Sequence, residues 1–186
     1  MHTYSQFDDM QLVSMTVSGD THAYREIVSR YEKMVARIVK SMLGDIQQAD
    51  DVGQDTFIRL YSSLKDFRGD SKLSTYIQKI AMNQSLNEIR RKKRFISLFY
   101  KEDEKGGSQE FEIQSYDEES GRDVKEVVQK ALDNLEPEFR AVVVLRSIQG
   151  YSTKETAEIL ELPIGTVLSR LSRAKEQLKG ILEKYL

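Results

Sequence analysis

The chain has 186 residues, of which 39% are hydrophobic, and its formal net charge at pH 7 is −2. This is enough apolar material for one ordinary domain or two small ones, and the near-neutral charge excludes a protein that simply coats nucleic acid. Because the chain has no cysteine and only two histidines, His2 and His22, we expect no disulfide, no metal site and no cofactor.

Apolar residues recur at three- and four-residue spacing along most of the chain, which predicts an all-α protein. We expect helices over residues 9–18, 21–42, 47–64, 71–94, 123–134, 137–147, 152–160 and 163–185. The expected breaks are Gly19, Gly44, Gly69 and Gly150. There is no apolar run of about eighteen residues and no export-type N-terminus, so a cytoplasmic protein without membrane insertion is expected.

The third expected helix has an acidic side. Its exposed residues are expected to be Asp51, Gln54 and Asp55. The residues available for packing are Val52, Phe57, Ile58 and Tyr61. An acidic face is unsuited to DNA, so it favours contact with a protein partner.

The segment 67–94 combines aromatic and basic residues. It begins with a glycine-containing loop, FRGDSKLSTY, and its helix carries Tyr76 and Asn83. It ends in five consecutive bases, Arg90, Arg91, Lys92, Lys93 and Arg94. Basic clusters hold phosphates, and aromatic surfaces such as Phe67 and Tyr76 can hold single strands or flipped bases. The alternative is a solvated helix end whose positive charges complement the helix dipole.

Helical periodicity disappears over residues 99–121, where acids, serines and glycines dominate. Such a segment is typical of a flexible acidic linker, although a long surface loop within one domain is the alternative. The linker reading predicts two small helical domains, residues 1–98 and 122–186.

The C-terminal segment predicts a helix-turn-helix. Ser152 and Glu155 have the spacing of a capping box, the first helix ends near Glu161, and Pro163 suits the first position of the next helix. The expected packed face of that helix is Ile164, Val167, Leu171, Ala174 and Leu178. Its other side carries Thr166, Ser169, Arg170, Arg173 and Gln177. Small polar residues followed by arginines suit the major groove of DNA, whereas the alternative is an ordinary helix hairpin with a solvated basic face.

Taken together, three segments resemble the extracytoplasmic-function sigma factors, the smallest promoter-recognition subunits of bacterial RNA polymerase. Residues 8–45 and 49–94 resemble their first conserved domain, and residues 135–178, which include PIGTVLSRLSRAKEQL, resemble their second. The resemblance implies a non-catalytic protein that binds core RNA polymerase, through the beta-prime clamp helices and the beta subunit, and promoter DNA. It also implies restraint by an anti-sigma factor.

The resemblance also implies roles for single residues. The residues that the resemblance implies for polymerase docking are Asp51, Gln54, Asp55 and Phe57. Recognition and melting of the minus-ten promoter element fall to Phe67, Arg68, Ser74, Tyr76 and Asn83, with Arg90, Arg91, Lys92, Lys93 and Arg94 on nearby phosphates. The minus-thirty-five element falls to Thr166, Ser169, Arg170 and Arg173.

Several positions depart from the pattern that the family usually shows. Tyr76 stands where tryptophan is usual, and Leu168 replaces a frequent lysine, which deletes one phosphate contact. Glu161 occupies a turn position where glycine is usual, so a left-handed conformation there would be strained.

Two other classes of protein compete with this interpretation. A free-standing helix-turn-helix regulator would bind a palindromic duplex as a dimer, but it leaves the acidic helix and the aromatic loop without a role. A hydrolase could use Asp50 and Asp51, but no nucleophile–base pair or phosphate-binding loop accompanies them, and neighbouring carboxylates on a helix diverge.

Overall fold

The structure is a computed structural model that describes residues 4–44, 46–100 and 124–183. Over these ranges it is helical with no strand, which confirms the all-α prediction. The N-terminal elements are η1 (Tyr4–Gln6), α1 (Asp9–Val17), α2 (Thr21–Leu43), α3 (Ile46–Ser63), η2 (Leu64–Asp66) and α4 (Leu73–Tyr100). The C-terminal elements are α5 (Val124–Asp133), α6 (Pro137–Val143), the π-helical turn η4 (Val144–Ile148), α7 (Thr153–Leu160) and α8 (Ile164–Leu182).

Each expected helix is present, and the predicted breaks are confirmed. Gly19, Gly44, Gly69 and Gly150 all have positive φ angles, a conformation that glycine adopts without a steric penalty. Helix α4 continues beyond the expected end at residue 94 and reaches Tyr100, so the first two residues of the predicted linker are helical. The rest of the predicted linker lies outside the described residues.

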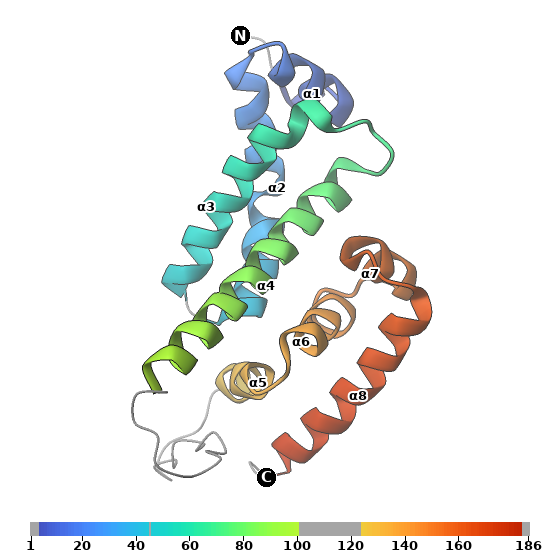
Figure 1. Ribbon diagram of the computed structural model, residues 1–186. Helices are drawn as coiled ribbons and strands as arrows, with labels where there is room; N and C mark the ends of the chain where they lie inside the picture. The colour runs from blue at the N-terminus through green and yellow to red at the C-terminus, as the bar shows by residue number, and fades with distance from the viewer. Residues whose placement is uncertain (1–3, 45, 101–123, 184–186) are drawn as a thin grey trace.

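The N-terminal domain is a bundle in which α2 packs against both α3 and α4 (Figure 1). Its fully buried side chains come from all of these helices and from α1, as the helical spacing of apolar residues predicts. The largest of them are Leu12, Ile27, Ile38, Met42, Leu60, Leu64, Ile77 and Met82. This core holds α3 and α4, which carry the predicted docking and minus-ten residues.

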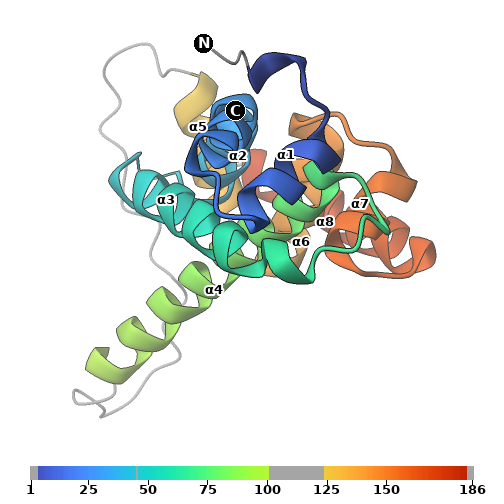
Figure 2. The same cartoon turned by 90° about the horizontal axis from the view of Figure 1, so that it is seen from above.

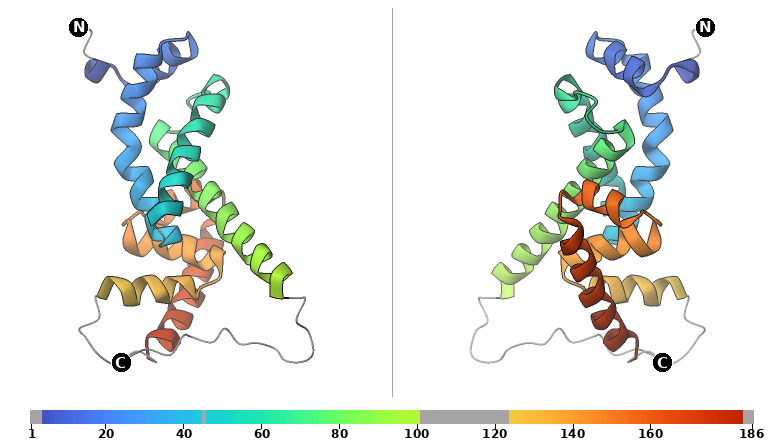
Figure 3. Two further views of the ribbon diagram at one scale, coloured as in Figure 1. Left: turned by 90° about the vertical axis from the view of Figure 1, so that its left-hand side faces the viewer. Right: turned by 90° about the vertical axis from the view of Figure 1, so that its right-hand side faces the viewer.

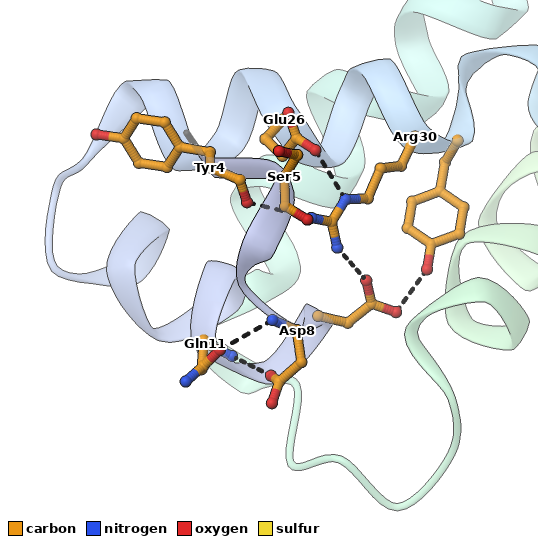
Figure 4. Close-up of polar contacts among 8 residues, drawn as sticks. Tyr4, Ser5, Asp8, Gln11, Glu26 and Arg30 are labelled. Atoms are coloured by element: carbon orange, nitrogen blue, oxygen red, sulfur yellow. Dashed lines mark hydrogen bonds and ion pairs between the residues drawn. The ribbon is translucent and has the colours of Figure 1, made fainter. Parts of the chain in front are cut away.

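Arg30 of α2 ties the N-terminal turn to this bundle (Figure 4). Its guanidinium donates to Glu26 Oε1 at 2.9 Å and to the carbonyl oxygens of Tyr4 and Ser5 at 3.2 and 3.1 Å. It also pairs with Asp9, 3.4 Å away, whose other carboxylate oxygen accepts from the Tyr31 hydroxyl at 2.5 Å. Burial, followed by the hydrogen bond to Asp9, raises the pKa of Tyr31.

The C-terminal helices α5 to α8 enclose two small apolar clusters of their own. One contains Leu132, Leu135, Val143 and Ala174, and the other contains Val142, Ala157 and Val167. Four further residues of this domain, Ala141, Val144, Leu145 and Ile159, belong instead to the buried cluster of the N-terminal domain. The two domains therefore share apolar surface, and α6, α7 and α4 lie together (Figure 2).

Polar contacts reinforce the junction between the domains. Arg140 of α6 is only 5% exposed, and its Nη1 donates to the carbonyl oxygen of Met42, at the end of α2, over 2.8 Å. Gly44 directly follows α2 and lies close to α5. If this residue had a Cβ, that atom would come within 2.8 Å of the Gln129 side chain. Glycine at this position thus permits both the turn and the close approach of α5.

Candidate docking and nucleic-acid interfaces

The acidic side of α3 is exposed as predicted. Asp51, Gln54 and Asp55 all face solvent, and their spacing places them on one side of the helix. Ile58 continues this side and is 65% exposed, so the expectation that it packs inward is wrong. The sequence could have predicted this exposure, because Ile58 follows Asp51 by seven residues and Asp55 by three, a spacing that places all three on the same side of a helix. We call Asp51, Gln54, Asp55 and Ile58 the docking stripe.

Phe57 lies apart from the docking stripe. Its side chain is partly buried and packs against the N-terminal core, and its carbonyl oxygen accepts from the Tyr24 hydroxyl at 2.5 Å. Tyr61 is half exposed and meets Tyr24 edge-on, with ring centroids 4.9 Å apart. These aromatic contacts fix the orientation of α3, which determines where the docking stripe points.

The predicted aromatic site is assembled where the loop joins α4. The rings of Phe67 and Tyr76 lie 5.0 Å apart at an interplanar angle of 39°, and both are partly buried. Arg68 beside them is exposed, whereas Ser74 is partly buried. Asn83 is exposed and follows Tyr76 by seven residues, so the two lie on the same side of α4. The structure therefore brings Phe67 and Tyr76 into contact, and it places Asn83 two turns further along the same side of α4.

The five bases lie in the part of α4 that extends away from the bundle (Figure 3). Lys92 is partly buried, and the other four are exposed. Arg91 pairs within its own helix, with Glu88 at 2.8 Å. Arg90 and Lys93 instead reach the C-terminal domain, where they pair with Glu138 at 2.7 Å and Glu136 at 3.2 Å. The sequence analysis singled out neither of these two acids.

The expected capping box at the start of α7 is confirmed. The Ser152 hydroxyl accepts from the backbone N–H of Glu155 at 3.2 Å, and the Glu155 carboxylate accepts from the N–H of Ser152 at 2.8 Å. Hydrogen bonds from Ser152 hold the pKa of Glu155 below its ordinary value. The side chain of Ser152 has the largest effect, and its backbone N–H has the next largest. Pro163 is the N-cap residue of α8, whereas the sequence predicted it at the first position within the helix.

The turn of the helix-turn-helix contains the strain predicted at Glu161. Its φ and ψ angles are 54° and 44°, and it is the only non-glycine residue in the described ranges with a positive φ. We expect Glu161→Gly to raise the free energy of unfolding by about 1 kcal/mol, because a left-handed conformation is unfavourable for residues with a Cβ. Thermal denaturation measures this gain. A Glu161→Ala variant that matches the glycine variant in stability would contradict the assignment to backbone strain.

Helix α8 presents only part of its predicted recognition side outward. Ser169 and Arg173 are exposed, whereas Thr166 and Arg170 are partly buried. Val167 and Ala174 are buried as expected, but Ile164, which was expected to pack, is half exposed. Leu168 is also 53% exposed, so an apolar side chain lies beside Ser169 on the outward side.

Neither metal ligation nor membrane spanning finds support in the described residues. They contain no group of three histidine, aspartate or glutamate side chains that could hold a metal ion. None of the helices within those ranges is long and apolar enough to cross a membrane.

Family models match both domains. Sigma-70 region 2 matches residues 27–95, and a sigma-70 region 4 model matches residues 125–178. The first match includes the docking stripe, the aromatic site and the five bases, and the second includes the helix-turn-helix.

Known proteins also match along most of the chain. RNA polymerase sigma-H factor of Pseudomonas aeruginosa is 31% identical over 98% of this chain and 97% of its own length. ECF RNA polymerase sigma factor SigW of Bacillus subtilis is 30% identical over 90% of this chain and 92% of its own length. Among solved structures, CnrH in complex with the cytosolic domain of CnrY has a TM-score of 0.66 at 26% identity, covering 95% of this chain and 97% of CnrH.

The fold and these matches define the class: a two-domain helical protein of the sigma-70 type whose second domain is a DNA-binding helix-turn-helix. Within that class, the chain belongs to the extracytoplasmic-function sigma factors of RNA polymerase, as the sequence resemblance predicted.

Proposed function

We propose that this sigma factor docks on core RNA polymerase through the docking stripe of α3 and carries promoter contacts on α4 and α8. The observation that supports this most strongly is the presence of three different surfaces on separate elements of the chain. They are an acidic and apolar stripe on α3, aromatic and basic residues on α4 and the loop before it, and a helix-turn-helix formed by α7 and α8. A free-standing regulator has no use for the first two of these surfaces.

The docking stripe is suited to a protein partner. It combines two carboxylates with the exposed side chain of Ile58. The apolar side chain would supply buried area, while the carboxylates would select a basic partner surface and accelerate association. On this proposal the partner surface lies on the clamp helices of the beta-prime subunit, and Phe57 acts by holding α3 in place.

Minus-ten recognition would use the aromatic site and the nearby bases. Phe67 and Tyr76 would provide a surface for an unstacked base, with Asn83 and Arg68 as hydrogen-bond donors nearby. Capture of such a base offsets the few kcal/mol that unstacking requires. The bases from Arg90 to Arg94 would hold the adjacent phosphates.

Minus-thirty-five recognition would use the exposed residues of α8. Ser169 and Arg173 would approach base edges and phosphates in the major groove, with Thr166 and Arg170 closer to the protein core. Because both domains are in one chain and one polymerase complex, two modest DNA contacts would add through their effective concentration.

Leu168 offers a test of the minus-thirty-five assignment. We expect Leu168→Lys to raise the promoter affinity of the holoenzyme about three- to tenfold at low salt, because a lysine there reaches one more phosphate. The plot of log affinity against log salt should steepen by about 0.9, the value for one additional phosphate on duplex DNA. Filter binding across a salt series measures both quantities. An unchanged slope would contradict a position of Leu168 beside the DNA backbone.

The remaining parts of the proposal concern regulation and cell biology. The similar protein CnrH was solved with a cytosolic protein domain, which supports a protein inhibitor of the anti-sigma kind for this chain too. We further propose that this sigma factor acts in the cytoplasm and has no enzymatic activity of its own.

The first experiment is reconstitution of the purified chain with bacterial core RNA polymerase. We expect co-elution and transcription from a promoter library, with the selected promoters sharing two conserved elements. Failure to associate with core, together with tight binding of the free chain to a palindromic duplex, would overturn the proposal in favour of a free-standing regulator.

A further inference from the structure

The loop between η2 and α4, residues 67–72, carries Phe67 and Arg68 of the proposed minus-ten site. We call it the glycine loop, because Gly69 near its centre has a φ angle of 78°, a left-handed conformation in which the chain changes direction. Arg68, Gly69 and Asp70 are all exposed. Burial of the central side chains therefore does not fix the position of this loop.

Met10 of α1 packs directly against the centre of the glycine loop. Its Cε and Sδ atoms lie 3.2 and 3.4 Å from the position that a Cβ on Gly69 would occupy. Two features therefore favour glycine at residue 69: its backbone conformation and the room that the thioether of Met10 takes. The Met10 side chain is 48% exposed, and a flexible thioether is well suited to fill an irregular gap beside a loop.

Helix α1 is firmly held at the end of the bundle where η2 leads into the glycine loop (Figure 1). A capping box closes its first turn: the Asp8 carboxylate accepts from the Gln11 N–H at 2.8 Å, and the Gln11 side chain accepts from the Asp8 N–H at 2.9 Å (Figure 4). Leu12 and Val13, which follow, are buried in the N-terminal core. Met10 therefore lies between a capped helix start and two buried residues, which fixes the place of its backbone.

We propose that Met10 is a positioning residue for minus-ten recognition: its thioether sets the position of the Gly69 backbone and, through it, the place of the loop's side chains around an unstacked base. This inference rests on the proposed function, because it requires the glycine loop to contact promoter DNA. It adds a residue from outside the segment 27–95 that the sigma-70 region 2 model matches. Met10 acts through the loop and makes no DNA contact of its own in this proposal.

The short distance along the chain from Gly69 to the aromatic site connects this contact to base capture. Arg68 directly precedes Gly69, and the ring of Phe67, one residue further back, lies 5.0 Å from that of Tyr76. A shift of the backbone at Gly69 therefore changes the opening between the Arg68 side chain and the two rings. Because an unstacked base is held mainly by stacking on aromatic side chains, such a shift weakens its binding.

The first test measures how the reconstituted holoenzyme binds two fragments of a promoter that it initiates from. One fragment is a fluorescent single strand with the minus-ten sequence, and the other is a duplex that contains only the minus-thirty-five element. We expect Met10→Ala to weaken binding of the single strand about three- to tenfold, which is part of what stacking of one base contributes, and to leave duplex binding unchanged. Met10→Leu, which keeps the volume and the apolar character, should retain most of the affinity for the single strand.

The matched control is Val17→Ala. Val17 is 53% exposed at the other end of α1, so this change also removes exposed apolar surface from the same helix. We expect the control to bind both fragments as the unaltered chain does. The inference would be overturned if Met10→Ala bound the single strand at full affinity, if Val17→Ala lost as much affinity, if Met10→Leu were as weak as Met10→Ala, or if both fragments were weakened alike.

A measurement on the free chain separates this inference from the proposed function. Because the protein has no cysteine, Asp70→Cys provides a single site in the glycine loop for a nitroxide spin label. We expect its mobility, measured by electron paramagnetic resonance, to rise in Met10→Ala and to stay unchanged in Val17→Ala. Unchanged mobility in Met10→Ala would overturn the positioning contact itself. Raised mobility, combined with an unaltered holoenzyme that shows no preference for the minus-ten sequence, would instead overturn the proposed function and with it the role of Met10 in recognition.

Discussion

Asp55→Arg is expected to lower the affinity for core RNA polymerase by about 100-fold or more without unfolding the protein. Asp55 is exposed at the centre of the docking stripe, between Gln54 and Ile58, so its replacement alters no buried contact. A carboxylate facing a basic surface would become a like charge in the interface, and such juxtaposition costs several kcal/mol. Fluorescence anisotropy of the labelled chain titrated with core polymerase measures the affinity, and circular dichroism confirms that the fold is retained.

Glu32→Arg provides the matched control for this variant. Glu32 is an exposed acid on α2, outside the docking stripe, so the same charge reversal leaves the proposed contact intact. We expect its polymerase affinity to stay within about threefold of the unaltered chain, as for charges outside an interface. Full polymerase affinity in Asp55→Arg would remove the docking stripe as the polymerase contact.

Much of this fold could be predicted from the sequence because its determinants are local. Helical spacing of apolar residues places all of the main helices, the four glycines mark real changes of direction, and the Ser152–Glu155 capping box forms as expected. Strain at Glu161 could also be predicted, because the family that the sequence resembles usually has glycine at this turn position, and glycine there indicates a left-handed conformation.

The contacts between the domains could not be predicted from the same patterns. Ion pairs such as Arg90–Glu138 join residues 48 positions apart, and no local rule selects that acid from the many in the chain. The orientation of Ile58 and Ile164 was misjudged because an apolar residue near the edge of a helical stripe faces inward or outward according to its tertiary neighbours. The partial burial of Arg170 also depends on tertiary neighbours, because α8 packs against α6.

Arg140→Ala is expected to lower the free energy of unfolding of the full chain by about 2–4 kcal/mol. The guanidinium of Arg140 is buried between the domains, where it donates to the Met42 carbonyl at 2.8 Å and to Asp133 at 2.9 Å. Arg140 is only 5% exposed, and this burial lowers its pKa despite the opposing effect of Asp133. Without the side chain, the Met42 carbonyl loses its inter-domain donor and a cavity opens beside α2.

The partner acid of Arg140 separates the hydrogen bond from the ion pair. The Asp133 side chain is 45% exposed, so Asp133→Asn should lower the free energy of unfolding by less than about 1 kcal/mol, as for other solvent-screened pairs. Arg140→Met, which keeps most of the buried volume but has no donor, should fall between the two variants. Chemical denaturation of all three measures the series. Equal losses in Asp133→Asn and Arg140→Ala would show that the ion pair within the C-terminal domain, and not the inter-domain bond from α6 to the end of α2, accounts for the stabilisation by Arg140.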